Sequence, residues 1–351
     1  MNNLSEIINS EPDSRNAAAD LLKGLAVLFM IQVHITELLA TESIYRSIAG
    51  KISLFLGGPP AAPVFMAVMG YFIAKSKKDI QSGLLRGLTL FAGGIVLNVL
   101  LNATLIFKFF LGTAEVNPLQ YIFAVDILPL AGLSIIVISA LKFFFRDKVY
   151  LYGIFTVLII AVNQFIPQGY SPENSSLRYI SAYIFSSEHW SYFPLLPWLV
   201  YPLIGFIFAL SEKKLTLKAN QNYMIEGIFI LFFILTINTV FDTVTSLPDY
   251  YHHSIELIIW NILFLAGYAA AAGVIEKAAG VWSVMKWIKW IGKNVTAAYV
   301  IQWIILGNAG SLFYKSLDGL WFFVWFAGVL VFVTAGIWFW GEYKNKIIIG
   351  D

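Results

Sequence analysis

Apolar runs of about twenty residues recur along the whole of this 351-residue chain, and each is long enough to cross the hydrocarbon core of a bilayer as an α-helix. Hydrophobic residues make up 59% of the chain and charged residues only 13%. A soluble domain carries about 25% charged residues. The sequence therefore predicts an all-α, polytopic integral membrane protein, built as one helical bundle.

The apolar runs predict ten spans, which form one domain over residues 17–340 between tails at 1–16 and 341–351. A breaker, GGPP at 57–60, lies near the start of the second span, and a polar segment follows the fifth. Residues 282–291 mix tryptophan with lysine, which suits an amphipathic helix at the membrane interface. The expected spans lie at about 17–39, 54–74, 83–103, 121–145, 150–166, 193–210, 224–240, 254–275, 295–313 and 320–340.

The basic residues of the short loops set the orientation of such a chain. With the N-terminus inside, the inner segments hold eighteen of the 23 lysines and arginines. The outer segments hold the other five, which are Arg46, Lys51, Lys108, Arg178 and Lys315. We therefore expect both termini in the cytoplasm, an even number of spans, and a bacterial inner membrane as the location.

The first span carries polar groups on one face of an apolar helix. Because a helix turns about 100° per residue, one stripe contains Asp20, Gly24, Val27, Ile31, His34 and Glu37. Fourteen residues at about 1.5 Å each separate Asp20 from His34 by roughly 21 Å along the axis. Asp20 and Lys23 are thus expected near the inner surface, and His34 and Glu37 near the outer surface.

Several chemistries are disfavoured by the sequence. There is no cysteine, which excludes disulfides, thiolate metal sites and cysteine nucleophiles. Neither phosphate-binding glycine motif, G-x-x-x-x-G-K-[ST] or G-x-G-x-x-G, occurs, and no nucleic-acid partner is predicted. His252 and His253 are adjacent and so do not face one way on a helix, and no further ligand lies at metal-binding spacing. We therefore predict no metal site.

Five motifs follow one another in the order and spacing of a known family. They are R…DLLKGLAVLFMIQVH at 15–34, GGPPAAPVFMAVMGYFIAKS at 57–76, VDILPLAGLSIIVISAL at 125–141, YFPLLPWLVYPLIGFIFA at 192–209 and IGKNVTAAYVIQWIIL at 291–306. This pattern resembles the membrane-bound acyltransferases related to heparan-α-glucosaminide N-acetyltransferase, within the acyltransferase 3 superfamily. Three positions depart from that pattern: Lys23 replaces an arginine, Val295 a serine and Gln302 a histidine.

The resemblance implies acyl transfer across the membrane. The donor would be a cytoplasmic acyl-CoA, most simply acetyl-CoA, and the acceptor an extracytoplasmic glycan or lipid-linked sugar. The roughly 21 Å between Asp20 and His34 is of the size that an extended pantetheine arm bridges. Membrane lipids are the remaining expected partners, and a homodimer is compatible with this interpretation.

His34 is the candidate base or acyl-carrying nucleophile, because acyl transfer to a hydroxyl or amine needs one of these groups. The alternative is a buried histidine held by a neighbour. Glu37, one turn on, could orient the imidazole or could simply lie among the outer headgroups. Asp126, in the outer part of the fourth predicted span, is a third catalytic candidate, because intramembrane carboxylates mark functional sites by default.

At the inner mouth, Lys23, Arg86 and Asn294 are the candidates for holding the acyl-CoA, since cationic groups bind phosphates. Asp20 and Lys23, three residues apart, are also expected to form an intrahelical ion pair, which is the structural alternative for Lys23.

The candidates for acceptor binding are Asn98, Asn102, Trp198 and Gln302. Asn98 and Asn102 are four apart and would line the same cavity or bond to neighbouring helices, and packing is slightly favoured for Asn98. Trp198 would stack on a sugar or anchor the membrane interface.

Two other functions compete with acyl transfer. A proton-coupled transporter or flippase would use His34 and the carboxylates as coupling groups, but the sequence has neither a detectable inverted repeat nor paired broken helices. A non-catalytic membrane scaffold would explain Gln302, but it gains nothing from polar groups inside the first helix.

Overall fold

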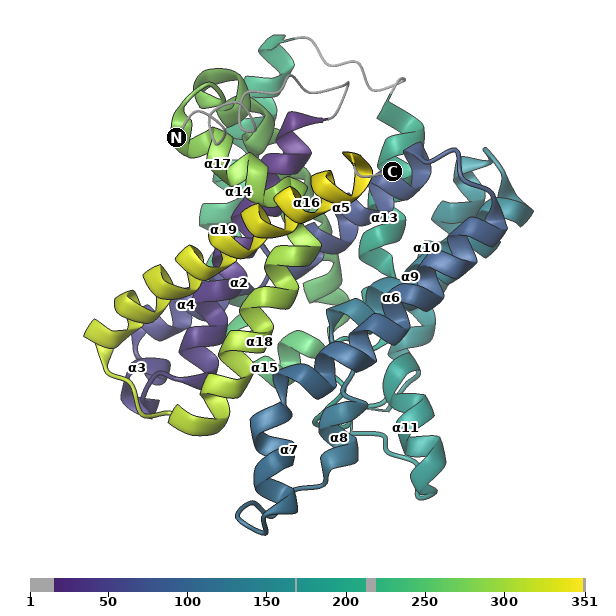
Figure 1. Ribbon diagram of the computed structural model, residues 1–351. Coiled ribbons are helices and arrows are strands. Elements are labelled where there is room, and N and C mark those ends of the chain that lie inside the picture. Colours follow the sequence, from purple (N-terminus) through teal and green to yellow (C-terminus); the bar gives the residue numbers. More distant parts are fainter. Residues whose placement is uncertain (1–15, 168, 213–218, 350–351) are drawn as a thin grey trace.

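The computed structural model describes residues 16–167, 169–212 and 219–349 (Figure 1). Within these residues the regular elements are all helices, which confirms the all-α prediction. They are α2 (Ala17–Leu38), α3 (Glu42–Arg46), α4 (Ile48–Gly57), α5 (Ala62–Lys75), α6 (Ile80–Leu101), α7 (Ala103–Phe110), α8 (Pro118–Ile122), α9 (Ile127–Phe145), α10 (Val149–Gln164), α11 (Ser175–Ile184), α12 (Leu195–Trp198), α13 (Val200–Ser211), α14 (Ala219–Thr245), α15 (Leu247–Tyr251), α16 (Ile255–Ala279), α17 (Ser283–Lys293), α18 (Val295–Phe313) and α19 (Gly319–Ile349).

Eight helical segments of the described chain are long and apolar enough to cross a membrane. They are Ala17–Leu38, Ile48–Lys75, Ile80–Leu101, Ile127–Phe145, Glu226–Thr245, Ile255–Ala279, Val295–Phe313 and Gly319–Glu342. Two shorter apolar helices, Val149–Gln164 and Leu195–Ser211, coincide with the fifth and sixth predicted spans. The membrane-embedded helical bundle is therefore confirmed, whereas the count of ten spans stays a prediction.

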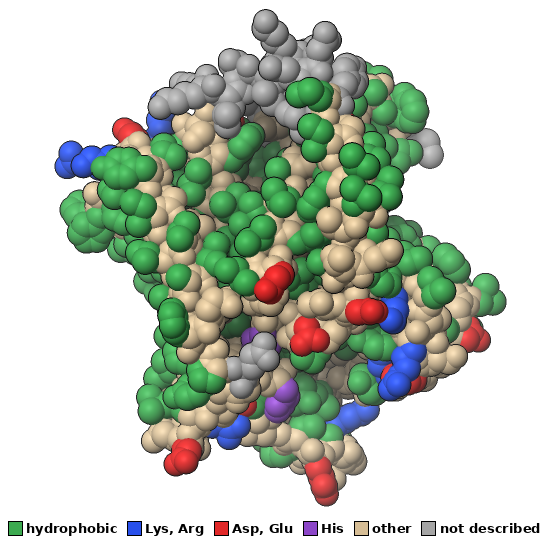
Figure 2. Space-filling view, turned by 180° about the vertical axis from the view of Figure 1, so that it is seen from behind, with side chains coloured by type: hydrophobic (Ala, Val, Ile, Leu, Met, Phe, Trp, Pro, Cys, Tyr) green, Lys and Arg blue, Asp and Glu red, His purple; other side chains and the backbone are tan. Residues whose placement is uncertain are grey.

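The two sides of the bundle differ in their short helices. α2 begins and α19 ends on the same side, where α17 also lies, and α3, α7, α8 and α11 lie on the opposite side (Figure 1). Following the predicted topology, we call these the inner and the outer side. On the face shown in Figure 2, apolar side chains cover most of the inner half, and acidic, basic and histidine side chains gather in the outer half.

Helix α2 is the centre of the bundle and contacts α4, α5, α16, α17, α18 and α19. The predicted stripe faces these neighbours, because Asp20, Gly24, Val27 and Ile31 are all buried. Gly24 allows the closest approach, since a Cβ there would lie 2.0 Å from the carbonyl oxygen of Ile288 in α17. The predicted amphipathic helix is present as α17, and one face of it is docked on the inner end of α2.

The second span differs from the prediction, because the GGPP breaker interrupts the segment instead of marking its start. Helix α4 precedes the breaker and α5 follows it within the apolar segment Ile48–Lys75. Prolines at 59 and 60 supply no backbone N–H for a continuous helix. Residues 58–65 are all buried, so the irregular backbone is enclosed by protein, as membrane depth requires. Gly57 places this break against α2, since its Cβ would lie 2.3 Å from Val33 Cβ.

Two further interruptions correct the sequence-based picture. The fourth span begins at Ile127 rather than near residue 121, because residues 123–126 separate α8 from α9. The sixth apolar segment is kinked at Leu196, whose backbone is not helical (φ −101°, ψ 121°). The second and sixth apolar segments are therefore both interrupted. Proline and the capping side chain of Asp126 are the local causes.

Glycines bring two pairs of helices into close contact. Gly83 and Gly87 of α6 face Ser139 and Gly132 of α9, at distances that leave no room for a Cβ. Small residues at helical spacing allow such close packing of membrane helices. Helices α5 and α13 meet in the same way, since a Cβ on Gly70 would lie 1.8 Å from the carbonyl oxygen of Pro202.

Candidate functional site

The imidazole of His34 packs against the indole of Trp303 near the outer end of α2. The two ring centroids are 3.9 Å apart, with an interplanar angle of 32°. Trp303 lies on α18, which contacts α2 along this face. His34 Nδ1 is buried and has no hydrogen-bond partner among the described residues. The ring is therefore positioned by aromatic packing, and its Nδ1 is left for chemistry or for a ligand.

Asp126 and Tyr299 form the second part of the site. The Tyr299 hydroxyl donates to Asp126 Oδ2 at 2.7 Å, and the Ile127 N–H donates to Asp126 Oδ1 at the same distance. Asp126 is the N-cap of α9, where the helix dipole favours a carboxylate. Tyr299 lies one helical turn before Trp303 on α18, with ring centroids 6.4 Å apart. A continuous chain of contacts thus links Asp126 to His34 through α18.

Glu37 lies one turn beyond His34. One of the two sequence-based interpretations expected its carboxylate to orient the imidazole, but His34 Nδ1 has no hydrogen-bond partner among the described residues. The ring packs on Trp303 instead. Glu37 interacts electrostatically with Lys315, in the outer loop between α18 and α19. Burial lowers the pKa of Lys315, and the negative charges of Glu42 and Glu37 oppose that shift. Lys315 is fixed to the end of α2 by its backbone, since its N–H donates to the Leu38 carbonyl oxygen at 3.0 Å. Glu37 therefore belongs to the outer rim of the site.

The side-chain amides of Asn98 and Asn102 both donate to backbone carbonyl oxygens. Asn98 Nδ2 donates to the carbonyl oxygens of Ile122 and Ala124, at 3.1 and 2.8 Å. These two bonds fix the non-helical segment that ends at Asp126. Asn102 Nδ2 donates to the Asn98 carbonyl oxygen at 2.9 Å, so its bond stays at the end of α6. Asn98 thus has the packing role that the sequence slightly favoured, and it positions Asp126 from outside the site.

Trp198 and Gln302 are both completely buried. Trp198 Nε1 donates to the Tyr251 carbonyl oxygen at 2.8 Å, so this indole supports the core and presents no open face to a sugar. Gln302 lies beside Trp303 on α18, and neither its Oε1 nor its Nε2 has a hydrogen-bond partner among the described residues. Such unpaired polar atoms are rare in protein interiors.

At the inner end, Lys23 Nζ lies 2.7 Å from Asp20 Oδ1 and 5.1 Å from the centroid of the Phe72 ring. This is the intrahelical ion pair that the spacing predicts. Asn294 turns the chain between α17 and α18, and its Nδ2 donates to the Trp290 carbonyl oxygen at 2.9 Å. Lys23 and Asn294 thus both have partners within the protein.

Arg86 lies apart from these two residues, in a pocket of about 370 Å³ between α5, α6 and α9. Lys78 and Lys142 contribute two more cations to its wall, and Asp79 one carboxylate. Lys142 Nζ donates to the carbonyl oxygens of Ile73 and Ser76. Within the described part of the chain, neither Arg86 nor Lys78 forms an ion pair. The pocket therefore carries excess positive charge at the inner side.

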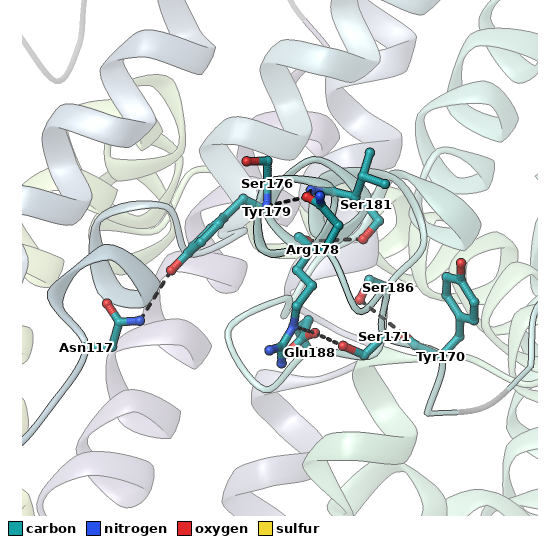
Figure 3. Close-up of polar contacts among 11 residues, drawn as sticks. Asn117, Tyr170, Ser171, Ser176, Arg178, Tyr179, Ser181, Ser186 and Glu188 are labelled. Atoms are coloured by element: carbon teal, nitrogen blue, oxygen red, sulfur yellow. Dashed lines mark hydrogen bonds and ion pairs between the residues drawn. The ribbon is translucent and has the colours of Figure 1, made fainter.

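The outer polar segment, over the described residues 169–194, forms a cap that includes the helix α11 rather than a plain loop. Arg178 donates to both carboxylate oxygens of Glu188, from Nε at 2.7 Å and from Nη2 at 3.0 Å, and Ser171 Oγ donates to the same carboxylate (Figure 3). Burial alone would raise the pKa of Glu188, but the bonds from Arg178 and Ser171 and the charge of Arg178 outweigh it and hold that pKa below its usual value. The cluster stabilises the cap that lies beside Asp126.

Comparison with known proteins identifies the chain. A family model described as an acyltransferase domain, that of the acyltransferase 3 family, matches residues 16–341. The chain belongs to the acyltransferase 3 family. No curated protein and no solved structure matches it. Family membership makes this protein a membrane acyltransferase in general terms, and the match includes every predicted site residue.

Four residues of the candidate site were not recognisable from the sequence: Trp303, Tyr299, Lys78 and Lys142. Their roles arise from contacts between helices, which no local pattern reveals. The one available signal was the spacing of Tyr299 and Trp303, four apart on the same predicted helix as Gln302. Among the described residues there is no group of three histidine, aspartate or glutamate side chains that could hold a metal ion.

Proposed function

We propose that this protein moves an acyl group, which we expect to be acetyl, from cytoplasmic acyl-CoA to an extracytoplasmic glycan or lipid-linked sugar. The observation that carries the proposal is the contact chain from His34 through Trp303 and Tyr299 to Asp126, at the outer half of the central helix. Family membership supplies the reaction class. The basic pocket around Arg86 supplies a place for the donor on the opposite side.

In the proposed reaction, an acceptor hydroxyl oxygen attacks the thioester carbonyl carbon. A carbon–oxygen bond forms, the carbon–sulfur bond breaks, and CoA leaves as the thiolate. His34 accepts the hydroxyl proton and then transfers it to that thiolate, so the products are an ester and the CoA thiol. A positioned base of this kind contributes about 10² to 10⁴ in rate. Asp126, fixed by Tyr299, accepts a hydrogen bond from a second acceptor hydroxyl.

The donor phosphates are assigned to the Arg86 pocket rather than to Lys23. Lys23 is engaged by Asp20, whereas Arg86 and Lys78 form no ion pair within the described residues, so their charges attract a multiply charged anion. The pantetheine arm would then run along the bundle toward His34. The axial separation of roughly 21 Å between Asp20 and His34 gives the depth from the inner end of α2 to His34. Asn294 lies apart from this pocket, at the inner end of α18, and its part in donor binding stays a prediction.

The test uses the purified full-length protein in nanodiscs with radiolabelled acetyl-CoA, measuring release of the CoA thiol and transfer of label to an added glycan. We expect His34→Gln to lower release at least 100-fold while the melting temperature stays unchanged. His189→Gln is the matched control, because His189 is an exposed outer histidine whose ring packs on Trp190, in the outer cap. Undiminished release by His34→Gln would remove His34 from the mechanism. Absence of acetyl-CoA binding to the wild-type protein would overturn the enzyme proposal in favour of a transporter or scaffold.

A second pair of variants tests the donor pocket. Arg86→Gln should raise the KM for acetyl-CoA about tenfold with little change in kcat, because a phosphate contact stabilises ground state and transition state alike. Lys77→Gln is the matched control, because Lys77 is an exposed cation next to Lys78 and does not line the pocket. Equal effects of the two variants would show that only the general positive charge of the inner surface matters.

A further inference from the structure

An apolar groove of about 540 Å³ lies between α17 and α19 and shares no residue with the candidate site. Trp287 of α17 forms one wall. The other wall is formed by α19, through Ala327, Leu330, Val331, Thr334, Ala335 and Trp338. Because α17 lies on the inner side and α19 ends there (Figure 1), the groove belongs to the inner half of the bundle. Its volume is within the range of roughly 300–1,000 Å³ that small-molecule sites have.

The groove lies on a surface that faces the bilayer. The segment Gly319–Glu342 of α19 is long and apolar enough to cross the membrane. Val331 in the groove wall is exposed, as are Phe332 and Phe339 on the same helix. Exposed apolar side chains of a membrane-spanning helix contact the hydrocarbon chains of lipids. Lipid acyl chains are therefore the molecules that reach this groove.

One hydrogen-bond donor in the groove wall has no acceptor. Trp338 Nε1 is buried and has no partner among the described residues. Buried donors without a partner are rare in folded proteins. Tryptophans are enriched near the headgroup level of membranes, where the ring is apolar and the N–H reaches a polar group. The ester carbonyl oxygen of a lipid whose chain fills the groove would supply the acceptor that Trp338 lacks.

The helix that forms the other wall is basic. Helix α17 carries Lys286, Lys289 and Lys293 and no acidic residue. Spacings of three, four and seven residues place these lysines on one face, about 100° around the helix from Trp287. Lys289 is paired with Glu276 at 3.1 Å, whereas Lys293 is exposed and forms no ion pair within the described part of the chain. A cationic face thus adjoins the apolar wall of the groove.

The sequence at the inner end of α19 is also basic on balance. Glu342 is the only acidic residue of α19, and Lys344 and Lys346 follow it. Basic amphipathic helices, and basic pockets between membrane helices on the cytoplasmic side, recognise anionic lipid headgroups. An apolar groove beside such a helix therefore fits a ligand that combines a long hydrocarbon chain with an anionic headgroup.

We propose that this groove binds one acyl chain of an anionic phospholipid from the inner leaflet. The chain lies between the indoles of Trp287 and Trp338, an ester carbonyl oxygen accepts from Trp338 Nε1, and the phosphate lies against the lysine face of α17. The lipid thus joins α17 to α19. Because a Cβ on Gly292 of α17 would lie 1.9 Å from the Asp20 carbonyl oxygen, the bound lipid also secures α17 against the central helix α2. The site is independent of acyl transfer.

Native mass spectrometry of the delipidated full-length protein in detergent tests the proposal. The probes are phosphatidylglycerol and phosphatidylcholine with the same palmitoyl and oleoyl chains. We expect the first phosphatidylglycerol to bind at least fivefold more tightly than phosphatidylcholine. Trp338→Phe should weaken that binding about fivefold, as the loss of one hydrogen bond does. Trp321→Phe, which changes an exposed indole outside the groove on the same helix, is the matched control and should leave the binding unchanged. Equal binding of the two lipids, or equal behaviour of the two variants, would overturn the proposal.

A second variant fills the groove instead of removing its donor. Ala335→Leu should keep the melting temperature of the lipid-free protein and lose the tight phosphatidylglycerol site. Because a ligand that binds only the folded state stabilises it, phosphatidylglycerol should raise the melting temperature of the wild-type protein and not that of Ala335→Leu. Tight binding that survives in Ala335→Leu would refute the site. A lipid-free dimer that Ala335→Leu separates into monomers would assign the groove to a second copy of the chain and likewise overturn the proposal.

Discussion

Replacing Tyr299 by phenylalanine should reveal how much the hydrogen bond to Asp126 contributes to the free energy of unfolding. The change removes one hydroxyl that donates to Asp126 Oδ2 at 2.7 Å, in a place where Tyr299 is 1% and Asp126 9% exposed. No bulk water competes for the bond. Hydrogen bonds to charged groups contribute about 1.5–3 kcal/mol, against roughly 0.6 kcal/mol for an average side-chain bond within a membrane protein. Because the N-terminus of α9 favours the ionised carboxylate, we expect the larger value.

The assay is a double-mutant cycle of Tyr299→Phe and Asp126→Ala, with unfolding by SDS in mixed micelles followed by circular dichroism. The coupling free energy should reach about 1.5 kcal/mol. Tyr152→Phe is the matched control, because the buried Tyr152 hydroxyl donates at 2.8 Å to a neutral acceptor, the Arg146 carbonyl oxygen. A coupling energy below about 0.5 kcal/mol, the usual limit of additivity, would refute the reasoning. So would a cost for Tyr299→Phe no greater than that of the control.

Two further predictions concern packing and pH. Gly70→Ala should abolish the folded, monodisperse protein in size-exclusion chromatography, because its Cβ would lie 1.8 Å from the Pro202 carbonyl oxygen. Gly93→Ala, whose Cβ would have nothing within 4 Å, should fold and gain about 0.5–1 kcal/mol in stability. Equal behaviour of the two variants would contradict the close contact of α5 and α13. The ion pair of Arg178 and Glu188 should protect the outer cap above the ordinary pKa of a glutamate and lose that protection as the pH falls through the lowered pKa of Glu188. Hydrogen exchange of residues 175–190 should therefore accelerate on acidification in the wild-type protein and depend far less on pH in Glu188→Gln, and a pH dependence that survives in Glu188→Gln would assign the effect to another group.

The sequence was sufficient for the helices and insufficient for their interruptions. Hydropathy and length predict membrane helices well because a bilayer leaves few alternatives to them. The close packing of Gly83 and Gly87 follows a similar rule, since small residues at helical spacing have few other uses in a membrane helix. The breaks within the second and fourth spans could not be placed in this way. Their positions depend on burial by other helices and on the capping carboxylate of Asp126, which are tertiary facts.

The residues of the candidate site likewise divide into those that the sequence reveals and those that it does not. His34 and Asp126 were recognisable because a polar residue inside an apolar run is conspicuous by itself. Trp303 and Tyr299 were not, because aromatic residues are ordinary in membrane helices until their partners are known. Trp198 shows the same dependence on contacts, since stacking on a sugar and anchoring at the interface were equally compatible with the sequence, and the structure encloses its indole between α15 and the outer cap. Candidate residues can therefore be found from one sequence, whereas the contacts that give them a role cannot.

The energetic cost of the site argues against a purely structural role for it. Gln302 is completely buried, and both of its polar side-chain atoms lack a partner among the described residues, as does His34 Nδ1. Each unsatisfied buried polar group costs about 1–3 kcal/mol. A leucine at position 302 would avoid that cost in a scaffold, where only packing matters. Unpaired polar atoms beside an aromatic-bound histidine, next to a buried break in the helix, are instead what a site needs when a polar substrate must enter and supply the missing hydrogen bonds.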